Sequence, residues 1–71
     1  MNANEWIGKF AAELGTEPPS EEEVGEILEL AATAAHASER IAAPLACWLA
    51  GREGRPLAEL RGVADGIAPD R

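Results

Sequence analysis

The chain has 71 residues, which allows one domain with only a small hydrophobic core. Its formal net charge of −7 creates a field that disfavours nucleic acid and anionic membrane surfaces as partners. A single cysteine, Cys47, excludes an intrachain disulfide, and a single histidine beside it argues against a structural zinc site, which takes four ligands. If the domain needs further support, a protein partner or a second copy is the remaining source.

The first expected helix covers residues 3–14. Asn2 precedes it and Glu5 follows three residues later, which is the spacing of a capping box. Gly15 suits the left-handed position that ends a helix. Apolar side chains recur on one face, at Trp6, Ile7, Phe10 and Leu14. Because this face holds two of the three aromatic residues, we expect it to supply much of the core.

A longer helix is expected over residues 21–42, after a break at Pro18 and Pro19. Ser20 and Glu23 form a second capping box. At about 100° per residue, one side of this helix is apolar and is predicted to be buried. That side contains Val24, Ile27, Leu28, Ala31, Ala34, Ala35, Ser38 and Ala42. The opposite, polar side contains Glu22, Glu26, Glu29, Thr33, His36 and Arg40.

Two shorter helices are expected over residues 44–53 and 56–67. Pro44 suits the start of the first, and Pro69 is expected to close the second. The chain has no strand-like alternation of polar and apolar residues and no internal repeat. The predicted fold class is therefore all-α, a compact bundle of four short helices that forms a single domain over residues 1–71.

The second half of the long helix contains the candidate site residues. His36 and Arg40 are four residues apart, so on a continuous helix they share a face, and Pro44 lies one turn further. One interpretation is that both are merely solvated. The other is a corner that binds a partner or an anion through the Arg40 guanidinium. Trp48 is expected in the core or in an interface, and Cys47 is expected to be a packing residue rather than a nucleophile.

The same segment resembles a known family through the pattern A-H-x-x-x-R-x-A-A-P-L-x-x-x-L-x-G. The matching residues are Ala35, His36, Arg40, Ala42, Ala43, Pro44, Leu45, Leu49 and Gly51. The chain is also similar to this family at Trp6, Ile7, Leu14 and Gly15 and at residues 27–31. One departure is Ile41, because the family commonly has a proline directly after the arginine. We therefore expect the long helix to continue to about Ala42.

This family is a small helical domain of high-GC bacteria. It occurs as a stand-alone chain and resembles the C-terminal segment of some molybdenum cofactor guanylyltransferases. Stand-alone members tend to sit beside genes for formate dehydrogenase maturation and for molybdoenzymes. The resemblance implies an association with molybdenum cofactor enzymes, and it assigns no catalytic residue.

The expected function is a non-catalytic accessory domain in molybdenum cofactor biosynthesis or molybdoenzyme maturation. Its expected partner is the guanylyltransferase or a molybdoenzyme subunit of the formate dehydrogenase type, contacted by His36, Arg40, Pro44 and Trp48. No cofactor or metal is expected. One alternative is a structural homo-oligomer. Another is a domain that binds a nucleotide or the pterin through Arg40 and a helix N-terminus.

Two further expectations concern activity and location. We do not expect an enzyme, because the sequence contains no recognisable pair of nucleophile and base. We expect a cytoplasmic protein, because there is no secretory leader and no apolar run of about 18 residues.

Overall fold

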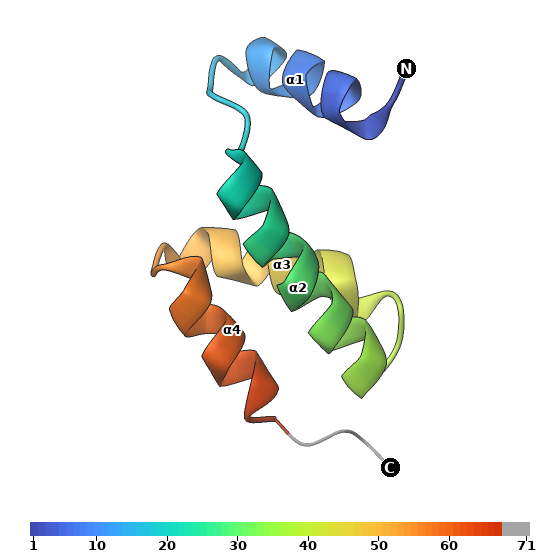
Figure 1. Cartoon of the computed structure of the whole chain (residues 1–71), viewed down its shortest axis with the longest axis vertical. Coiled ribbons are helices and arrows are strands. Elements are labelled where there is room, and N and C mark those ends of the chain that lie inside the picture. Colours follow the sequence, from blue (N-terminus) through green and yellow to red (C-terminus); the bar gives the residue numbers. More distant parts are fainter. Residues whose placement is uncertain (68–71) are drawn as a thin grey trace.

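The computed structural model describes residues 1–67, and this part of the chain contains four helices (Figure 1). They are α1 (Ala3–Leu14), α2 (Glu21–Ala37), α3 (Ala42–Glu53) and α4 (Leu57–Asp65). No strand occurs in residues 1–67. The predicted all-α bundle of four short helices is confirmed.

Both predicted capping boxes are formed, so the first two helices begin where local chemistry places them. The backbone N–H of Glu5 donates to Asn2 Oδ1 over 2.8 Å, and the N–H of Asn2 donates to Glu5 Oε1 over 3.1 Å. The corresponding distances for Ser20 and Glu23 are 3.1 and 2.8 Å. Gly15 ends α1 with a φ of 76°, a conformation that costs glycine little.

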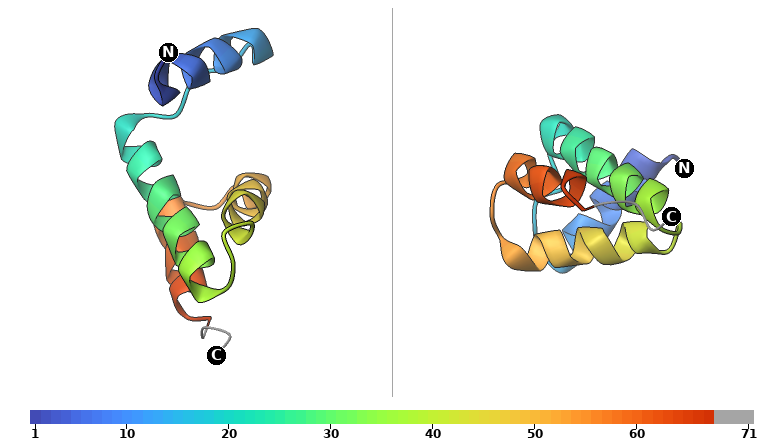
Figure 2. Two further views of the ribbon diagram at one scale, coloured as in Figure 1. Left: turned by 90° about the vertical axis from the view of Figure 1, so that its right-hand side faces the viewer. Right: turned by 90° about the horizontal axis from the view of Figure 1, so that it is seen from below.

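The core lies between α2, α3 and α4. Its buried residues are Leu30 of α2, Ala50 of α3 and Leu60 of α4, with Leu57 and Ala64 packed against them. Figure 2 shows α2 and α4 side by side, with α3 running across beneath them. The long second helix is therefore the element on which the other two pack.

The buried face of α2 differs from the prediction. Leu28, which we expected in the core, is 62% exposed, whereas Leu30 is only 4% exposed. The reason is that α4 packs on the side predicted to be polar. There Arg61 Nη1 lies 3.0 Å from Glu26 Oε2, and the Thr33 hydroxyl donates to Asp65 Oδ1 over 3.2 Å.

The expectation that the first helix supplies much of the core is wrong. Trp6 and Phe10 are 53% and 49% exposed, and their ring centroids lie 5.2 Å apart, so they pack mainly on each other. Helix α1 lies beyond the N-terminal end of α2, at the far end of the molecule from the end of α4 (Figure 1). The prolines at 18 and 19 keep the connecting segment from continuing either helix.

The boundaries of the later helices differ from the predictions by up to five residues. Helix α2 ends at Ala37 rather than Ala42, and α3 begins two residues before Pro44. Helix α4 is shorter than predicted at both ends, and Pro69 lies outside the described residues. None of the helices within residues 1–67 has the length and apolar character needed to cross a membrane.

Candidate functional site

The predicted site residues lie around the turn from α2 to α3. His36 is in the last turn of α2, Arg40 is in the connection, and Pro44 and Trp48 are on α3. The side chains of all four residues are exposed. They are thus placed on the surface, where a partner could reach them, and their role in binding stays a prediction.

The turn itself is made by hydrogen bonds that end α2 early. The Ser38 hydroxyl donates to the carbonyl of Ala34 over 2.9 Å, and the Ser38 N–H donates to the same carbonyl over 3.2 Å. A serine side chain that competes in this way for backbone acceptors favours the end of a helix. The Ala42 N–H then donates to the carbonyl of Glu39 over 2.9 Å, which turns the chain toward α3.

The early end of α2 corrects the predicted geometry of the site. Because Arg40 lies beyond the end of α2, it does not share a helical face with His36. The predicted shared face of these two residues is therefore wrong. Ile41 does not extend the helix, although it replaces the proline of the family pattern. Pro44 is the third residue of α3, a position whose backbone N–H would have no partner within the helix.

The sequence analysis missed Arg52, which lies one turn after Trp48 on α3. Its guanidinium carbon lies 4.5 Å from the centroid of the Trp48 ring. A cation in this position stabilises the arrangement by about 0.5–1 kcal/mol at an exposed site. The i, i+4 spacing of a tryptophan and an arginine was the available signal. Together, Pro44, Trp48 and Arg52 follow one another at four-residue intervals along α3.

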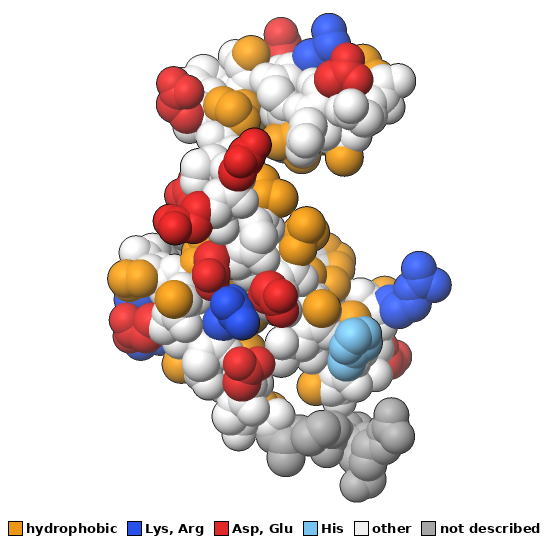
Figure 3. Space-filling model, viewed as in Figure 1, with side chains coloured by type: hydrophobic (Ala, Val, Ile, Leu, Met, Phe, Trp, Pro, Cys, Tyr) orange, Lys and Arg blue, Asp and Glu red, His pale blue; other side chains and the backbone are white. Residues whose placement is uncertain are grey.

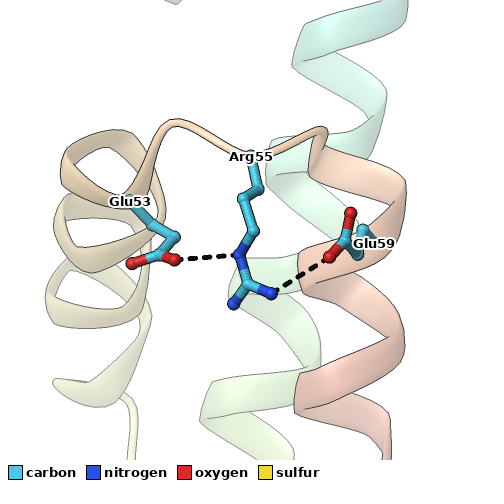
Figure 4. Close-up of polar contacts among 3 residues, drawn as sticks. All are labelled: Glu53, Arg55 and Glu59. Carbon is cyan, nitrogen blue, oxygen red and sulfur yellow. Dashed lines mark hydrogen bonds and ion pairs between the residues drawn. The ribbon is translucent and has the colours of Figure 1, made fainter.

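Other arginines of the chain have structural roles. Figure 4 shows Arg55 between Glu53 and Glu59, with Nε 2.9 Å from the first carboxylate and Nη1 3.0 Å from the second. These contacts bracket the turn from α3 to α4, and as exposed ion pairs they stabilise it only weakly. Within residues 1–67, Arg40 forms no ion pair, so its guanidinium differs from that of Arg55.

Cys47 faces the inside of the bundle. Its side chain is partly buried, and its Sγ lies 3.9 Å from the backbone carbonyl oxygen of Ile27. Burial raises the pKa of the Cys47 thiol. A thiol that stays protonated is a poor nucleophile, which agrees with the packing role expected for this residue.

A groove of about 410 Å³, called the apolar groove below, lies between the second half of α2, helix α3 and the end of α4. Its lining residues are Leu30, Thr33, Ala34, Ala37, Ser38, Ala42, Leu45, Ala46, Leu49, Ala64 and Ile67. Five of the lining residues are alanines, so a neighbouring helix could approach its backbone closely. Pro44 and Trp48 are not among the residues that line the groove.

No group of three or more His, Cys, Asp or Glu residues that could hold a metal ion occurs in residues 1–67. The most distinctive feature of this surface is the exposed Trp48 ring with the Arg52 guanidinium over it. Trp and Arg are the residue types enriched among those that dominate binding energy in protein interfaces.

Comparison with known proteins assigns the family. A family model described as a domain of unknown function, DUF6457, matches residues 1–68. The comparisons with curated proteins and with solved structures found no match. Since the family model matches nearly the whole length, the chain belongs to the DUF6457 family.

Proposed function

We propose that this chain is a non-catalytic interaction domain in molybdenum cofactor biosynthesis or molybdoenzyme maturation. The observation that carries the interaction role is the 62% exposed Trp48 with Arg52 stacked on its ring. Large aromatic side chains exposed to water are costly for an isolated domain and favourable in an interface. The molybdenum context is supported by the resemblance of residues 35–51 to the domain that accompanies molybdenum cofactor guanylyltransferases.

In the proposed contact, Trp48 inserts into a pocket of the partner, and Arg52 holds its ring in place. Arg40 supplies fork-shaped donors for a carboxylate of the partner, since its guanidinium forms no ion pair within residues 1–67. His36 and Pro44 lie on either side of Arg40 in the sequence and form the edge of this contact. The domain contributes binding and orientation, and the chemistry belongs to the partner enzyme.

The test is the affinity of the full chain for the guanylyltransferase and for a formate dehydrogenase subunit, measured by titration calorimetry. If Trp48 is a hot spot worth about 2 kcal/mol, Trp48→Ala raises the Kd by roughly thirtyfold. Arg40→Ala is expected to raise it by about tenfold or more. The matched control is Arg55→Ala, which removes an exposed arginine from the turn between α3 and α4, outside the proposed contact, and leaves the Kd unchanged.

The possible results separate the site from the function. Binding that is equally tight for native protein, Trp48→Ala and Arg40→Ala would show that the contact lies elsewhere on the domain. Absence of binding to both partners would reject the proposed function itself.

A further inference from the structure

Two apolar surfaces of this chain lie uncovered at opposite ends of the molecule. One is the α1 face, formed by Trp6, Ile7, Phe10 and Leu14, whose side chains are 39–63% exposed. The other is the apolar groove, where Leu45 and Leu49 are 62% and 52% exposed. In Figure 3, hydrophobic side chains line both sides of the notch between α1 and the rest of the molecule.

The accessible surface is much larger than that of a compact monomer. The chain exposes 5679 Å², whereas a folded monomer of its 7.5 kDa mass exposes about 4,200 Å². A fully exposed segment of four residues adds at most about 600 Å², so an excess of about 800–1,400 Å² belongs to residues 1–67. The radius of gyration is 13.0 Å, against about 11 Å for a compact domain of this length.

The size of the excess points to a second copy as the cover. If two chains each buried about 800–1,400 Å², the interface would total about 1,600–2,800 Å², which spans stable interfaces of standard size and the lower part of the range of obligate homodimers. A transient contact buries less than about 1,200 Å² in total, or about 600 Å² per chain, and would leave part of the excess exposed.

The two surfaces also complement each other in side-chain size. The α1 face presents Trp6 and Phe10, which are large and already packed against each other. Five of the eleven residues that line the groove are alanines, whose small side chains leave room for large ones beside Leu45 and Leu49. Large side chains of one helix packing between the ridges of another is the usual way in which helices associate.

The connection between α1 and α2 favours contact with another chain over contact within the same chain. Both of its ends are fixed, because the Thr16 N–H donates to the carbonyl of Ala11 over 3.0 Å and the Ser20 N–H donates to Glu23 over 2.8 Å. Between them, Pro18 and Pro19 restrict the backbone to extended conformations. Short, stiff connections of this kind favour the exchange of a helix between two copies.

We infer that the chain forms a symmetric dimer in which α1 of each copy lies in the apolar groove of the other. Two identical contacts then cover the α1 face and the groove of both copies, which is the closed arrangement expected of a homodimer with twofold symmetry. The inference is independent of the proposed function, because it uses the groove lining and α1 rather than Arg40, Pro44 and Trp48.

The primary experiment is sedimentation velocity of the full chain over a dilution series. The expected mass is twice the 7.5 kDa of one chain. Phe10→Glu and Leu45→Glu place a charge in the α1 face and in the groove respectively, and each is expected to weaken the dimer by about a hundredfold or more. Val63→Glu is the matched control, because Val63 is 54% exposed on α4 and lies outside both surfaces.

A mixing experiment tests the reciprocal arrangement. In an equimolar mixture of Phe10→Glu and Leu45→Glu chains, a heterodimer places both substitutions in one contact and leaves the other contact intact. In sedimentation velocity, the mixture is therefore expected to contain a dimer that neither variant forms alone. Circular dichroism of each variant is expected to show that it remains helical. A native chain that stays monomeric at every concentration would overturn the inference. Variants that dimerise like the native chain, or a mixture in which no dimer forms, would overturn it as well.

Discussion

Truncation of Leu30 is the sharpest test of the core described above. Leu30 is 4% exposed and lies at the centre of the contacts that join α2 to Ala50 of α3 and Leu60 of α4. Leu30→Ala removes most of the side chain from this centre. Leu28→Ala, two residues earlier on the same helix, makes the same chemical change at a position that is 62% exposed.

The expected loss follows from the surroundings of each leucine. A buried Leu→Ala change costs about 2–5 kcal/mol, and the highest values belong to sites that leave a closed, dry cavity. Leu30 also lines an open groove beside Ile27 and Cys47, on the other side from the apolar groove, so water can fill part of the vacated space. We therefore expect a loss of about 2–3 kcal/mol for Leu30→Ala, whereas Leu28→Ala stays within about 0.5 kcal/mol of the native chain.

The assay is urea denaturation followed by far-ultraviolet circular dichroism, with thermal melts in parallel. Fluorescence is a poor probe of the core, because Trp48 is exposed in the folded chain and Trp6 lies on α1, outside the core. For a domain of this size, 2–3 kcal/mol corresponds to a fall in Tm of about 10–20 °C. All variants are compared at one chain concentration, since association would make the midpoint depend on concentration.

The outcome has a simple reading. Equal losses for the two variants, or a larger loss for Leu28→Ala, would refute the position of α4 on α2 and restore the buried face predicted from the sequence. A change in the slope of the denaturation curve for Leu30→Ala alone would indicate a change in the unfolded or native ensemble rather than in packing.

Three further changes test local features by the same denaturation assay or by thiol modification. Gly54→Ala is expected to lower the free energy of unfolding by about 1–2 kcal/mol, because Gly54 has a φ of 76°. Gly51→Ala lies inside α3 with open space around the added Cβ, and it is expected to raise the free energy of unfolding by about 0.5–1 kcal/mol. The reverse order of stability would contradict the left-handed cap at Gly54. Ser20→Ala loses the cap of α2 and about 1 kcal/mol, and a neutral result would show that the capping box is dispensable. Burial raises the pKa of Cys47, so an aromatic disulfide reagent modifies it more slowly in the folded chain than in urea; equal rates would contradict its burial.

The sequence by itself determined the features that depend on neighbouring residues. The starts of α1 and α2 and the end of α1 were predicted to the residue, because Asn2, Ser20 and Gly15 act on hydrogen bonds within one turn of themselves. The all-α class followed from the same local signals. The exposure of His36 and Arg40 was also predicted correctly, since charged and polar residues rarely have a place in so small a core.

Only the tertiary structure decided which apolar residues are buried. Helical periodicity ranks the faces of α2 by hydrophobicity, and on that basis it predicted Leu28 rather than Leu30 to be buried. It contains no information that α4 packs on the side of α2 that carries Glu26. The break at Ser38 also moved Arg40 off the helix and away from the face of His36. The aromatic face of α1 was predicted to be core because it is apolar, yet burial requires a second surface within reach, and the end of α2 to which α1 is joined provides none.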